Sequence, residues 1–361
     1  MAHPSCLPLL TPPASLCLLR LSAIGDVCHA VAVVQALRCY WPETRISWVI
    51  GKNEAALLAG LEGVELIPYD KRSGWRGWWA LRRQLADRRF DVLLQMQVAL
   101  RASWLSLAIG AQLRLGFERR RAREGQWLFT NAYALPARGE HVIDGFAAFI
   151  ETLGVPWPGP SWQMPLSNEL RQWAEQQGDG RPLLIISPSA SKAERNWTVA
   201  GYAVLAEHAA AHGYQVMLCG GPSASDAQLA AAIVGQCGVA LDNRVGQTSL
   251  KQLLALLACA RLVVGPDSGP LHMAATVGTP ALGLYAHSNP ARNGPLAAGS
   301  QVVSVYEQVL AETTGRESSG HRWGRRNRGQ QLMQRIDVAA VLAAFDAMVA
   351  TAPAQAECSC G

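Results

Sequence analysis

The stretch LVVGPDSGPLHMAA, residues 262–275, joins an apolar run to a segment of small residues and decides the predicted fold. Its first part, Leu262–Gly265, is continuously apolar, which is typical of a strand buried on both faces. The part from Gly269 to Val277 has the small and apolar residues of a packed helix. A buried strand that turns directly into a helix is the beginning of a βαβ unit, whose strands run parallel.

The same alternation extends outward from this stretch in both directions. Strands are predicted at Ser15–Leu21, Arg45–Ile50, Val64–Pro68, Phe90–Gln95, Leu183–Ser187, Gln215–Cys219 and Ala281–Leu284. Helices are predicted at Asp26–Tyr40, Trp75–Ala86, Ala102–Ile109, Val142–Leu153, Val199–Ala211, Ser225–Val234, Leu250–Cys259 and Asp337–Val349. Residues 286–334 show no clear period and are expected to be irregular. The pattern therefore predicts an α/β fold with mostly parallel sheets covered on both faces.

A proline-rich segment divides this pattern into two halves. Residues 154–168 contain four prolines and two glycines, which indicates an interdomain linker. We therefore predict a flexible tail over residues 1–14, Rossmann-like domains over 15–160 and 161–334, a C-terminal helix over 335–350 and a flexible tail over 351–361. The two domains are expected to face a cleft, because ligands of such sheets bind beyond the carboxyl ends of the strands.

The composition excludes several classes of protein. Of the 361 residues, 50% are hydrophobic and 16% are charged, which is too apolar for a disordered chain. No apolar run reaches the roughly 18 residues that span a bilayer, and the N-terminus lacks the pattern of an export signal. The nine cysteines are scattered, so free thiols in a reducing cytoplasm are expected, several of them in the core (Cys17, Cys28, Cys219 and Cys259). The pair Cys358 and Cys360 is expected to be frayed rather than metal-binding.

The net charge of +5 is unevenly distributed. Residues 1–165 contain 18 Lys and Arg against 13 Asp and Glu, whereas residues 166–361 contain 14 of each. The basic surplus of the N-terminal half indicates an anionic partner there: nucleic acid, anionic lipid or a phosphorylated sugar. No recognisable nucleic-acid recognition module accompanies this surplus, so nucleic acid is not an expected partner.

Two loops at predicted strand ends open helices with polar residues. Asp26 either caps the helix that follows it or acts as a general base. The segment from Asp267 to Gly269 opens a helix whose free N–H groups and dipole favour anions, and Ser268 adds a hydroxyl. The alternative for this second loop is an ordinary helix cap with His272 in the core.

A third loop, residues 187–197, combines several serines with Lys192 and Arg195. A lysine supplies a point charge and an arginine a bidentate fork, so together they can hold a diphosphate. A solvated loop in which Trp197 packs against the next helix is an equally valid interpretation. The glycines near Asp26 do not have the G-x-G-x-x-G spacing, so the dinucleotide-binding fingerprint is absent from that turn.

Four motifs together resemble those of the ADP-heptose:lipopolysaccharide heptosyltransferases, glycosyltransferase family 9. They are SAIGD (residues 22–26), SPSASKAERNW (187–197), LCGGP (218–222) and VGPDSGPLHMAA (264–275). The resemblance implies a GT-B architecture with the donor mostly on the C-terminal domain. It also implies transfer of heptose from ADP-heptose to the lipopolysaccharide inner core, with inversion at the sugar, without a bound metal and without any other cofactor.

The resemblance also assigns roles to residues. Asp26 matches the catalytic base of the family, and His141 matches a position that faces the acceptor; a histidine at a helix start without a ligand is the alternative. The donor side is matched by Ser189, Lys192, Arg195, Thr248, Asp267, Ser268, Gly269 and His272. Relatives place a lysine shortly before the tryptophan of the third loop, where this chain has Arg195. Both Lys192 and Arg195 therefore stand as candidates for the diphosphate.

The acceptor is expected on the basic half. Arg120 and Arg121, in a run of four arginines over residues 119–123, are assigned to phosphate or carboxylate groups of a lipid A–Kdo or heptosyl acceptor. The segment 75–89 is either a sheet-covering helix with a Trp-rich core face or an interfacial helix on an anionic inner-membrane surface. The protein is expected to be cytoplasmic and peripheral on the inner face of the inner membrane. The arginine cluster 322–328 is either a lid or a surface tail.

Other functions also fit the sequence. One is a GT-B enzyme that uses another nucleotide sugar, either as a transferase or as an epimerase. Another is a non-catalytic nucleotide-sugar-binding protein, in which Asp26 is only a helix cap.

Overall fold

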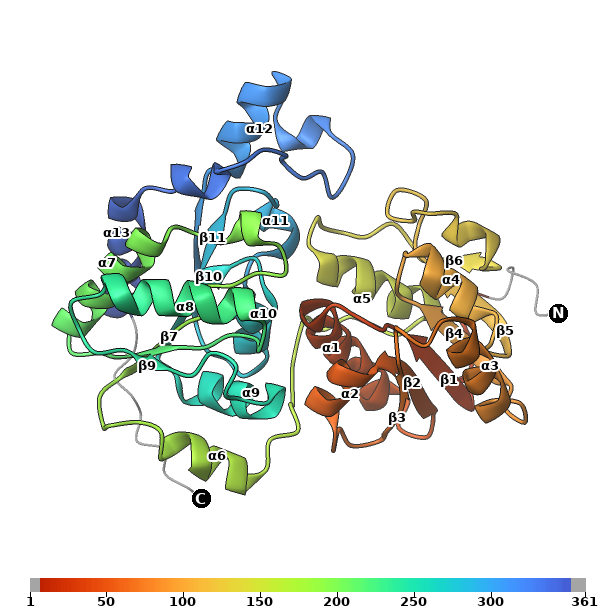
Figure 1. Ribbon diagram of the computed structural model, residues 1–361. Helices are drawn as coiled ribbons and strands as arrows, with labels where there is room; N and C mark the ends of the chain where they lie inside the picture. Colours follow the sequence, from red (N-terminus) through yellow and green to blue (C-terminus); the bar gives the residue numbers. More distant parts are fainter. Residues whose placement is uncertain (1–6, 352–361) are drawn as a thin grey trace. The chain divides into compact units, whose positions relative to one another are not determined.

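The computed structural model describes residues 7–351, and the chain forms two compact α/β units (Figure 1). Unit 1 comprises residues 1–165 and unit 2 residues 166–361, so the division falls inside the proline-rich segment 154–168. The middle of that segment is bonded to unit 1, where Nε1 of Trp162 donates to a backbone carbonyl of the first helix at 2.8 Å. The predicted flexible tails, 1–14 and 351–361, lie partly outside the described residues, and Cys358 and Cys360 lie outside them. Within residues 7–14, the backbone N–H of Leu9 donates to the carbonyl of Leu153 at 3.1 Å.

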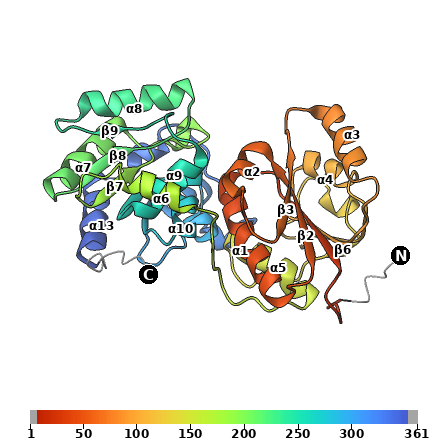
Figure 2. The same cartoon turned by 90° about the horizontal axis from the view of Figure 1, so that it is seen from below.

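Unit 1 is built on a six-stranded parallel sheet with the order β3-β2-β1-β4-β5-β6. The strands are β1 (Ser15–Leu19), β2 (Arg45–Gly51), β3 (Val64–Tyr69), β4 (Phe90–Gln95), β5 (Ala111–Gly116) and β6 (Ala132–Tyr133). The helices are α1 (Ile24–Tyr40), α2 (Lys52–Leu58), α3 (Gly74–Gln84), α4 (Leu100–Ser106) and α5 (Val142–Leu153), with a 3₁₀ turn η2 (Gln126–Leu128). Helices α1 and α5 pack together on one face of the sheet, and α3 and α4 cover the other face (Figure 2).

Unit 2 repeats this plan with the strand order β12-β11-β10-β7-β8-β9, again all parallel. The strands are β7 (Leu183–Ile186), β8 (Gln215–Leu218), β9 (Asp242–Asn243), β10 (Leu262–Pro266), β11 (Ala281–Tyr285) and β12 (Gln301–Ser304). The helices are α6 (Asn168–Glu175), α7 (Val199–Ala211), α8 (Ala224–Gln236), α9 (Leu250–Cys259), α10 (Gly269–Thr276), α11 (Pro290–Asn293), α12 (Tyr306–Thr314) and α13 (Val338–Thr351). Helices α7, α8 and α13 share one hydrophobic core with the sheet, while α9 packs against both α6 and α10.

The central strands are the continuous apolar runs that the sequence indicates. Every residue of β7, β8, β10 and β11 is buried. Such strands need helices on both faces, because neither face carries the polar residues that would interact with water. The predicted fold class, α/β with two Rossmann-like parallel sheets, is confirmed.

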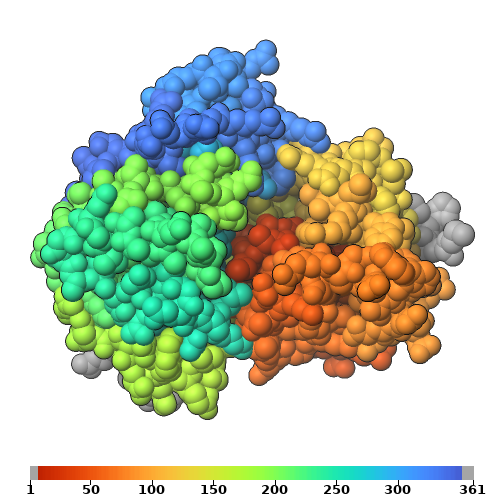
Figure 3. Space-filling model, viewed as in Figure 1, coloured from red at the N-terminus to blue at the C-terminus, as the bar shows by residue number. Residues whose placement is uncertain are grey.

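The segment 286–334 is more regular than predicted. It contains α11, the edge strand β12 and helix α12, and α12 with the residues after it projects from the rest of unit 2 (blue in Figure 3). Strand β12 is only four residues long and no residue of it is fully buried. Because an edge strand is covered on fewer sides than a central strand, it lacks the apolar run by which the other strands are predicted.

The exposure of side chains on helix α3 contradicts one of the two interpretations of segment 75–89, the helix with a Trp-rich core face. Within this helix only Leu81 is buried, whereas Trp75 and Trp79 are 65% and 51% exposed. Trp78 is half-buried and packs against a tryptophan of α4 at a ring-centroid distance of 5.3 Å. A Trp-rich core face is therefore wrong for Trp75 and Trp79, because Leu81 and the following Leu85 supply the contact with the sheet.

Two expectations drawn from composition can be compared with the structure. Over residues 7–351, the helices are each too short or too polar to cross a bilayer.

The six cysteines in this range are free thiols, as predicted, and Cys17, Cys28 and Cys219 are buried. Cys259 is partly exposed instead of buried, because it is the last residue of helix α9.

Candidate active site

The first candidate site lies on unit 2, at the carboxyl ends of the neighbouring strands β7 and β10. These two strand ends approach closely at Gly265, where a Cβ atom would stand 2.6 Å from the carbonyl oxygen of Ser187. Glycine is required there, since any side chain would push the two loops apart. The loops that the sequence indicates after β7 and β10 therefore lie side by side.

Asp267 is the centre of a polar cluster in these loops. Its Oδ2 accepts a hydrogen bond from Oγ of Ser288 at 2.7 Å and lies 3.7 Å from a guanidinium nitrogen of Arg195. Its Oδ1 lies 3.7 Å from Nε2 of His272. Burial acts to raise the pKa of Asp267, but hydrogen bonding to His272 and Ser288 and the charge of Arg195 outweigh burial and hold this pKa well below its usual range. Asp267 is therefore a buried carboxylate that orients three side chains around it.

The same cluster contains polar atoms that have no partner. Oγ of Ser187, Ser189 and Ser268 and Nε of Arg195 are buried without a hydrogen bond to any described residue. Ser268 stands at the N-cap of α10, yet its side chain makes no capping bond. Buried donors without partners are costly, and a bound oxygen-rich ligand satisfies them. Together with the positive end of the α10 dipole, these groups form a site suited to an anion.

The structure separates the two candidate cations. The side chain of Arg195 is 9% exposed and lies beside Asp267. The side chain of Lys192 is 60% exposed, and its Nζ lies 3.8 Å from a carboxylate oxygen of Glu194. Thr248 is half-buried in the loop between β9 and α9, which is hydrogen-bonded to the end of β8. Arg195 is thus the basic residue that the fold brings into the Asp267 cluster.

The segment after β11 supplies residues that sequence reasoning missed. Ser288, whose hydroxyl reaches the buried carboxylate, forms an antiparallel bridge with Arg326. Asn327 is buried and donates from Nδ2 to two backbone carbonyls, both at 2.9 Å. The cluster 322–328 is therefore anchored at the carboxyl end of β11 and is not a free surface tail. Burial and, to a smaller extent, the charge of Arg326 lower the pKa of Arg195.

The Asp267 cluster predicts an acid-dependent contribution to stability. Because the pKa of Asp267 is lower in the folded chain than its unfolded value of about 3.9, this contribution is present above that value and is lost as the pH falls toward the folded pKa. We therefore expect Asp267→Asn to cost less stability at pH 3 than at pH 6. Urea unfolding at both pH values measures the difference, with the exposed Asp87→Asn as the control. An equal cost at the two pH values would contradict a role of the charge.

The second candidate site lies on unit 1, beyond the carboxyl end of β1. Asp26 is in the first turn of α1, where its Oδ2 accepts a hydrogen bond from the backbone N–H of Ala23 at 3.3 Å and forms an ion pair with Arg20. The Asp26 side chain is 28% exposed, and its Oδ1 has no hydrogen bond to a described residue. Asp26 therefore caps the helix with one oxygen and leaves the other without a hydrogen bond to a described residue.

Arg20 is a buried partner of Asp26 that sequence reasoning missed. Its side chain is 11% exposed, donates to the carbonyl of Met96, and lies 5.3 Å from the ring of Phe146. Beside it, the backbone N–H of Leu21 donates to Oε1 of Gln97 at 2.7 Å. These bonds tie the ends of β1 and β4 together and fix the cation that holds Asp26. The signal in the sequence is a single charge inside the apolar run SLCLLRL.

The predicted acceptor residues of unit 1 differ in exposure. Arg120 is exposed and pairs with a glutamate at 2.8 Å. Arg121 is 3% exposed and donates to the carbonyl of His141 at 3.0 Å. Nδ1 of His141 caps α5, and its ring lies edge-on to that of His29 at a centroid distance of 5.2 Å. Arg121 therefore holds the start of α5 in place, and the run of four arginines is not a uniform surface patch.

The sequence matches the family described as Glycosyltransferase family 9 (heptosyltransferase) over residues 78–322. It is 45% identical over 338 residues to a Haemophilus influenzae protein named lipopolysaccharide core heptosyltransferase OpsX, and the match covers 93% of this chain and 97% of that protein.

Two solved structures share the fold. The glycosyl transferase family 9 protein from Veillonella parvula DSM 2008 has a TM-score of 0.77 at 21% identity, covering 93% of this chain and 97% of its own. The Escherichia coli ADP-heptose lps heptosyltransferase II has a TM-score of 0.69 at 22% identity, covering 93% and 98%. This likeness confirms the GT-B fold class. The family model matches most of the sequence, and the 45% identity extends over nearly the full length of both this chain and the Haemophilus influenzae protein. These two findings show that this chain belongs to glycosyltransferase family 9 and is a heptosyltransferase.

Proposed function

We propose that this heptosyltransferase transfers heptose from ADP-heptose to the inner core of lipopolysaccharide. The names of two relatives support the substrates, because one specifies the lipopolysaccharide core and the other ADP-heptose. The observation that carries the proposal is the cluster on unit 2, where a buried arginine, a helix start and unbonded serine hydroxyls gather at two strand ends. This is the donor set that a sugar diphosphate requires.

The proposed donor site assigns each group a task. Arg195 contacts the diphosphate, which also accepts hydrogen bonds from the hydroxyls of Ser189 and Ser268 and from the first backbone amides of α10, beginning at Gly269. Asp267 and His272 keep Arg195 in place, since the buried carboxylate contacts both. Thr248 is proposed to contact the nucleoside and the exposed Lys192 to add charge at the edge of the site.

The proposed reaction is a single displacement at C1 of the heptose. An acceptor hydroxyl forms a bond to C1 while the bond from C1 to the diphosphate oxygen breaks, and ADP leaves with that electron pair. The proton of the hydroxyl goes to the carboxylate of Asp26, whose Oδ1 is the free oxygen. Arg195 and the helix start stabilise the charge that develops on the diphosphate, and this assignment does not use a metal ion.

Product analysis tests the proposal most directly. The purified chain is incubated with ADP-heptose and a set of truncated lipopolysaccharide acceptors, and the products are identified by mass spectrometry. The expected result is one added heptose on an inner-core acceptor. Calorimetric titration with ADP, UDP and GDP checks the nucleotide separately, and tighter binding of UDP or GDP than of ADP would indicate another nucleotide sugar.

On the acceptor side, the proposal keeps His141 and the exposed Arg120 as contacts for anionic groups of the acceptor. Arg121 contributes by positioning, because it is bonded to the backbone that carries His141. The basic surplus of the N-terminal half supports this placement, since the inner-core acceptor is anionic.

We also propose that unit 1 binds an anionic membrane surface through helices α3 and α4. These helices expose large apolar side chains: Trp75, Trp79, Leu100, Trp104 and Leu107. Arg76, Arg82 and Arg83 are exposed on the same helix as the first two tryptophans. Exposed tryptophans beside arginines suit the boundary between lipid headgroups and acyl chains.

This proposal predicts salt-sensitive binding to anionic vesicles. Because each arginine near such a surface contributes about 1 kcal/mol, the double variant Arg82→Gln and Arg83→Gln is expected to weaken binding roughly 10-fold or more. Vesicle co-sedimentation at low and high salt measures the effect, with vesicles of neutral lipid for comparison. Trp79→Ala should also weaken binding, whereas Val234→Ala, an exposed apolar residue of unit 2, should not. Equal binding to neutral and anionic vesicles would refute the electrostatic part.

A further inference from the structure

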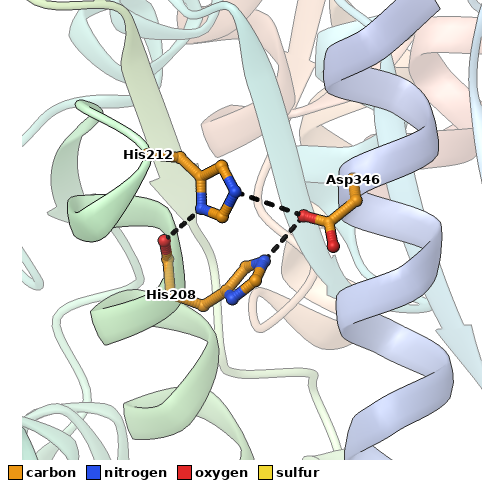
Figure 4. A group of neighbouring side chains, drawn as sticks. All are labelled: His208, His212 and Asp346. Atoms are coloured by element: carbon orange, nitrogen blue, oxygen red, sulfur yellow. Dashed lines mark hydrogen bonds and ion pairs between the residues drawn. The ribbon is translucent and has the colours of Figure 1, made fainter.

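Two histidines and an aspartate form a separate cluster on unit 2 (Figure 4). His208 lies in the last turn of α7 and His212, four residues on, is the C-cap residue of that helix; Asp346 faces them from α13. One ligand atom from each residue lies within 4.8 Å of the other two. We propose that this cluster binds a divalent transition metal ion of the Zn²⁺ class, which fastens α13 to α7.

The orientation of His212 supports a ligand on its Nε2. Its Nδ1 lies 2.8 Å from the carbonyl oxygen of His208, and because a carbonyl only accepts, Nδ1 carries the proton. Nε2 is then the nitrogen that can bind a metal, and it faces Oδ1 of Asp346 at 3.9 Å. Two acceptors that face each other repel unless a cation lies between them. Metal-binding histidines are oriented in this way, with the second nitrogen bonded to a carbonyl or carboxylate.

The distances also fit a shared ion. Nε2 of His208 lies 2.6 Å from the same Oδ1 that faces His212. Bonds of about 2.0–2.2 Å to Zn²⁺ place two ligands of a tetrahedral ion roughly 3.3–3.5 Å apart, which is between the two observed distances of 2.6 and 3.9 Å. Binding would therefore replace the proton shared by His208 and Asp346 with the metal, and that proton would be released.

The surroundings favour a structural rather than a catalytic ion. Both imidazole rings lie against the buried ring of Phe345, at centroid distances of 5.7 and 6.2 Å. The histidines stand at the end of α7, and His212 lies three residues before β8 begins at Gln215, so the cluster is at the amino ends of the strands. The Asp267 cluster is at the carboxyl ends of the same sheet. Three protein ligands leave one position of a tetrahedral ion to water. Because the cluster lies at the other end of the sheet from Asp267, an ion bound there would act by holding two helices together.

Zinc titration of the full chain tests the site. The protein is treated with EDTA, exchanged into buffer, and titrated calorimetrically with ZnCl₂ at pH 7.5. We expect the wild-type chain to bind a zinc ion. In His212→Ala and in Asp346→Asn, the affinity for zinc should fall at least 100-fold. His321→Ala is the matched control, because this histidine of unit 2 lies outside the cluster and should leave the affinity unchanged. Zinc that binds to cysteines instead would bind equally well to the histidine and aspartate variants, so the difference in affinity between variants distinguishes the two kinds of site.

Thermal unfolding gives a second measurement that does not depend on transfer activity. A ligand that binds only the folded chain raises Tm, and at about 100 times its Kd a rise of roughly 5–10 °C is expected for a unit of this size. The rise should disappear in His212→Ala and remain in His321→Ala. Zinc affinity that is the same in wild type, His212→Ala and Asp346→Asn would overturn the proposal, and so would no rise in Tm; the cluster would then be an ordinary ion pair.

Discussion

Replacing Asp26 by asparagine is expected to slow heptose transfer by about 10²–10⁴-fold, the usual contribution of a general base. Asparagine has nearly the same shape as aspartate and keeps an oxygen for the helix cap, but it cannot accept the proton of the acceptor hydroxyl. Binding of ADP should be unchanged, because the diphosphate contacts are assigned to unit 2. Initial rates by product quantification, together with calorimetric titration of ADP, measure the two effects separately.

Asp144→Asn is the matched control for this prediction. Asp144 occupies the corresponding position in the first turn of α5, where its Oδ2 accepts a hydrogen bond from the backbone N–H of the N-cap residue at 3.0 Å. If Asp26 matters only as a helix cap, the two variants should behave alike and lose stability rather than rate. Normal turnover by Asp26→Asn would show that the base has been assigned wrongly. Arg20→Gln is a third variant for the same measurements, because it removes the cation that positions Asp26 and leaves the Asp26 carboxylate.

Much of the fold was predictable because the central strands are decided locally. Strand β4 and helices α5, α7 and α9 have the predicted bounds. Their signals are strong, since a strand covered on both faces must be apolar throughout and a helix against a sheet must repeat its apolar residues. The elements that were missed are edge or peripheral ones, such as β5 and α6. In such elements some side chains face the protein interior and others face water, so apolar and polar residues are mixed in the sequence: β5 reads AQLRLG.

The candidate site was predictable only in part, for a similar reason. The loops at strand ends could be located, because a polar residue directly after an apolar run is visible in the sequence. Their partners could not be found in this way, because Ser288 comes from another loop and Arg20 stands directly after β1, within an apolar run. Nor does sequence alone distinguish a buried arginine from an exposed one: Arg120 and Arg121 are neighbours, yet only Arg121 is buried.

The difference in burial between Lys192 and Arg195 predicts which of them is the diphosphate ligand. Arg195→Ala is expected to reduce both ADP affinity and the rate of transfer by roughly 10²–10³-fold, comparable to losing a preorganised donor at a developing anion. Lys192→Ala, in contrast, should change either quantity by less than about threefold, because an exposed charge is screened by water and salt. Calorimetric titration with ADP measures affinity on the site itself, and initial rates follow the transfer.

Arg195→Ala also removes the cation beside a buried carboxylate, so its effect on folding must be separated from its effect on binding. Urea unfolding should show a loss of stability for Arg195→Ala, since Asp267 then keeps, among the described residues, Ser288 and His272 as partners. Arg195→Lys retains a positive charge without the planar fork, and we expect it to recover stability and part of the ADP affinity. If Arg195→Ala binds ADP normally while Lys192→Ala does not, the exposed lysine is the diphosphate ligand. Arg195 would then be a purely structural partner of Asp267.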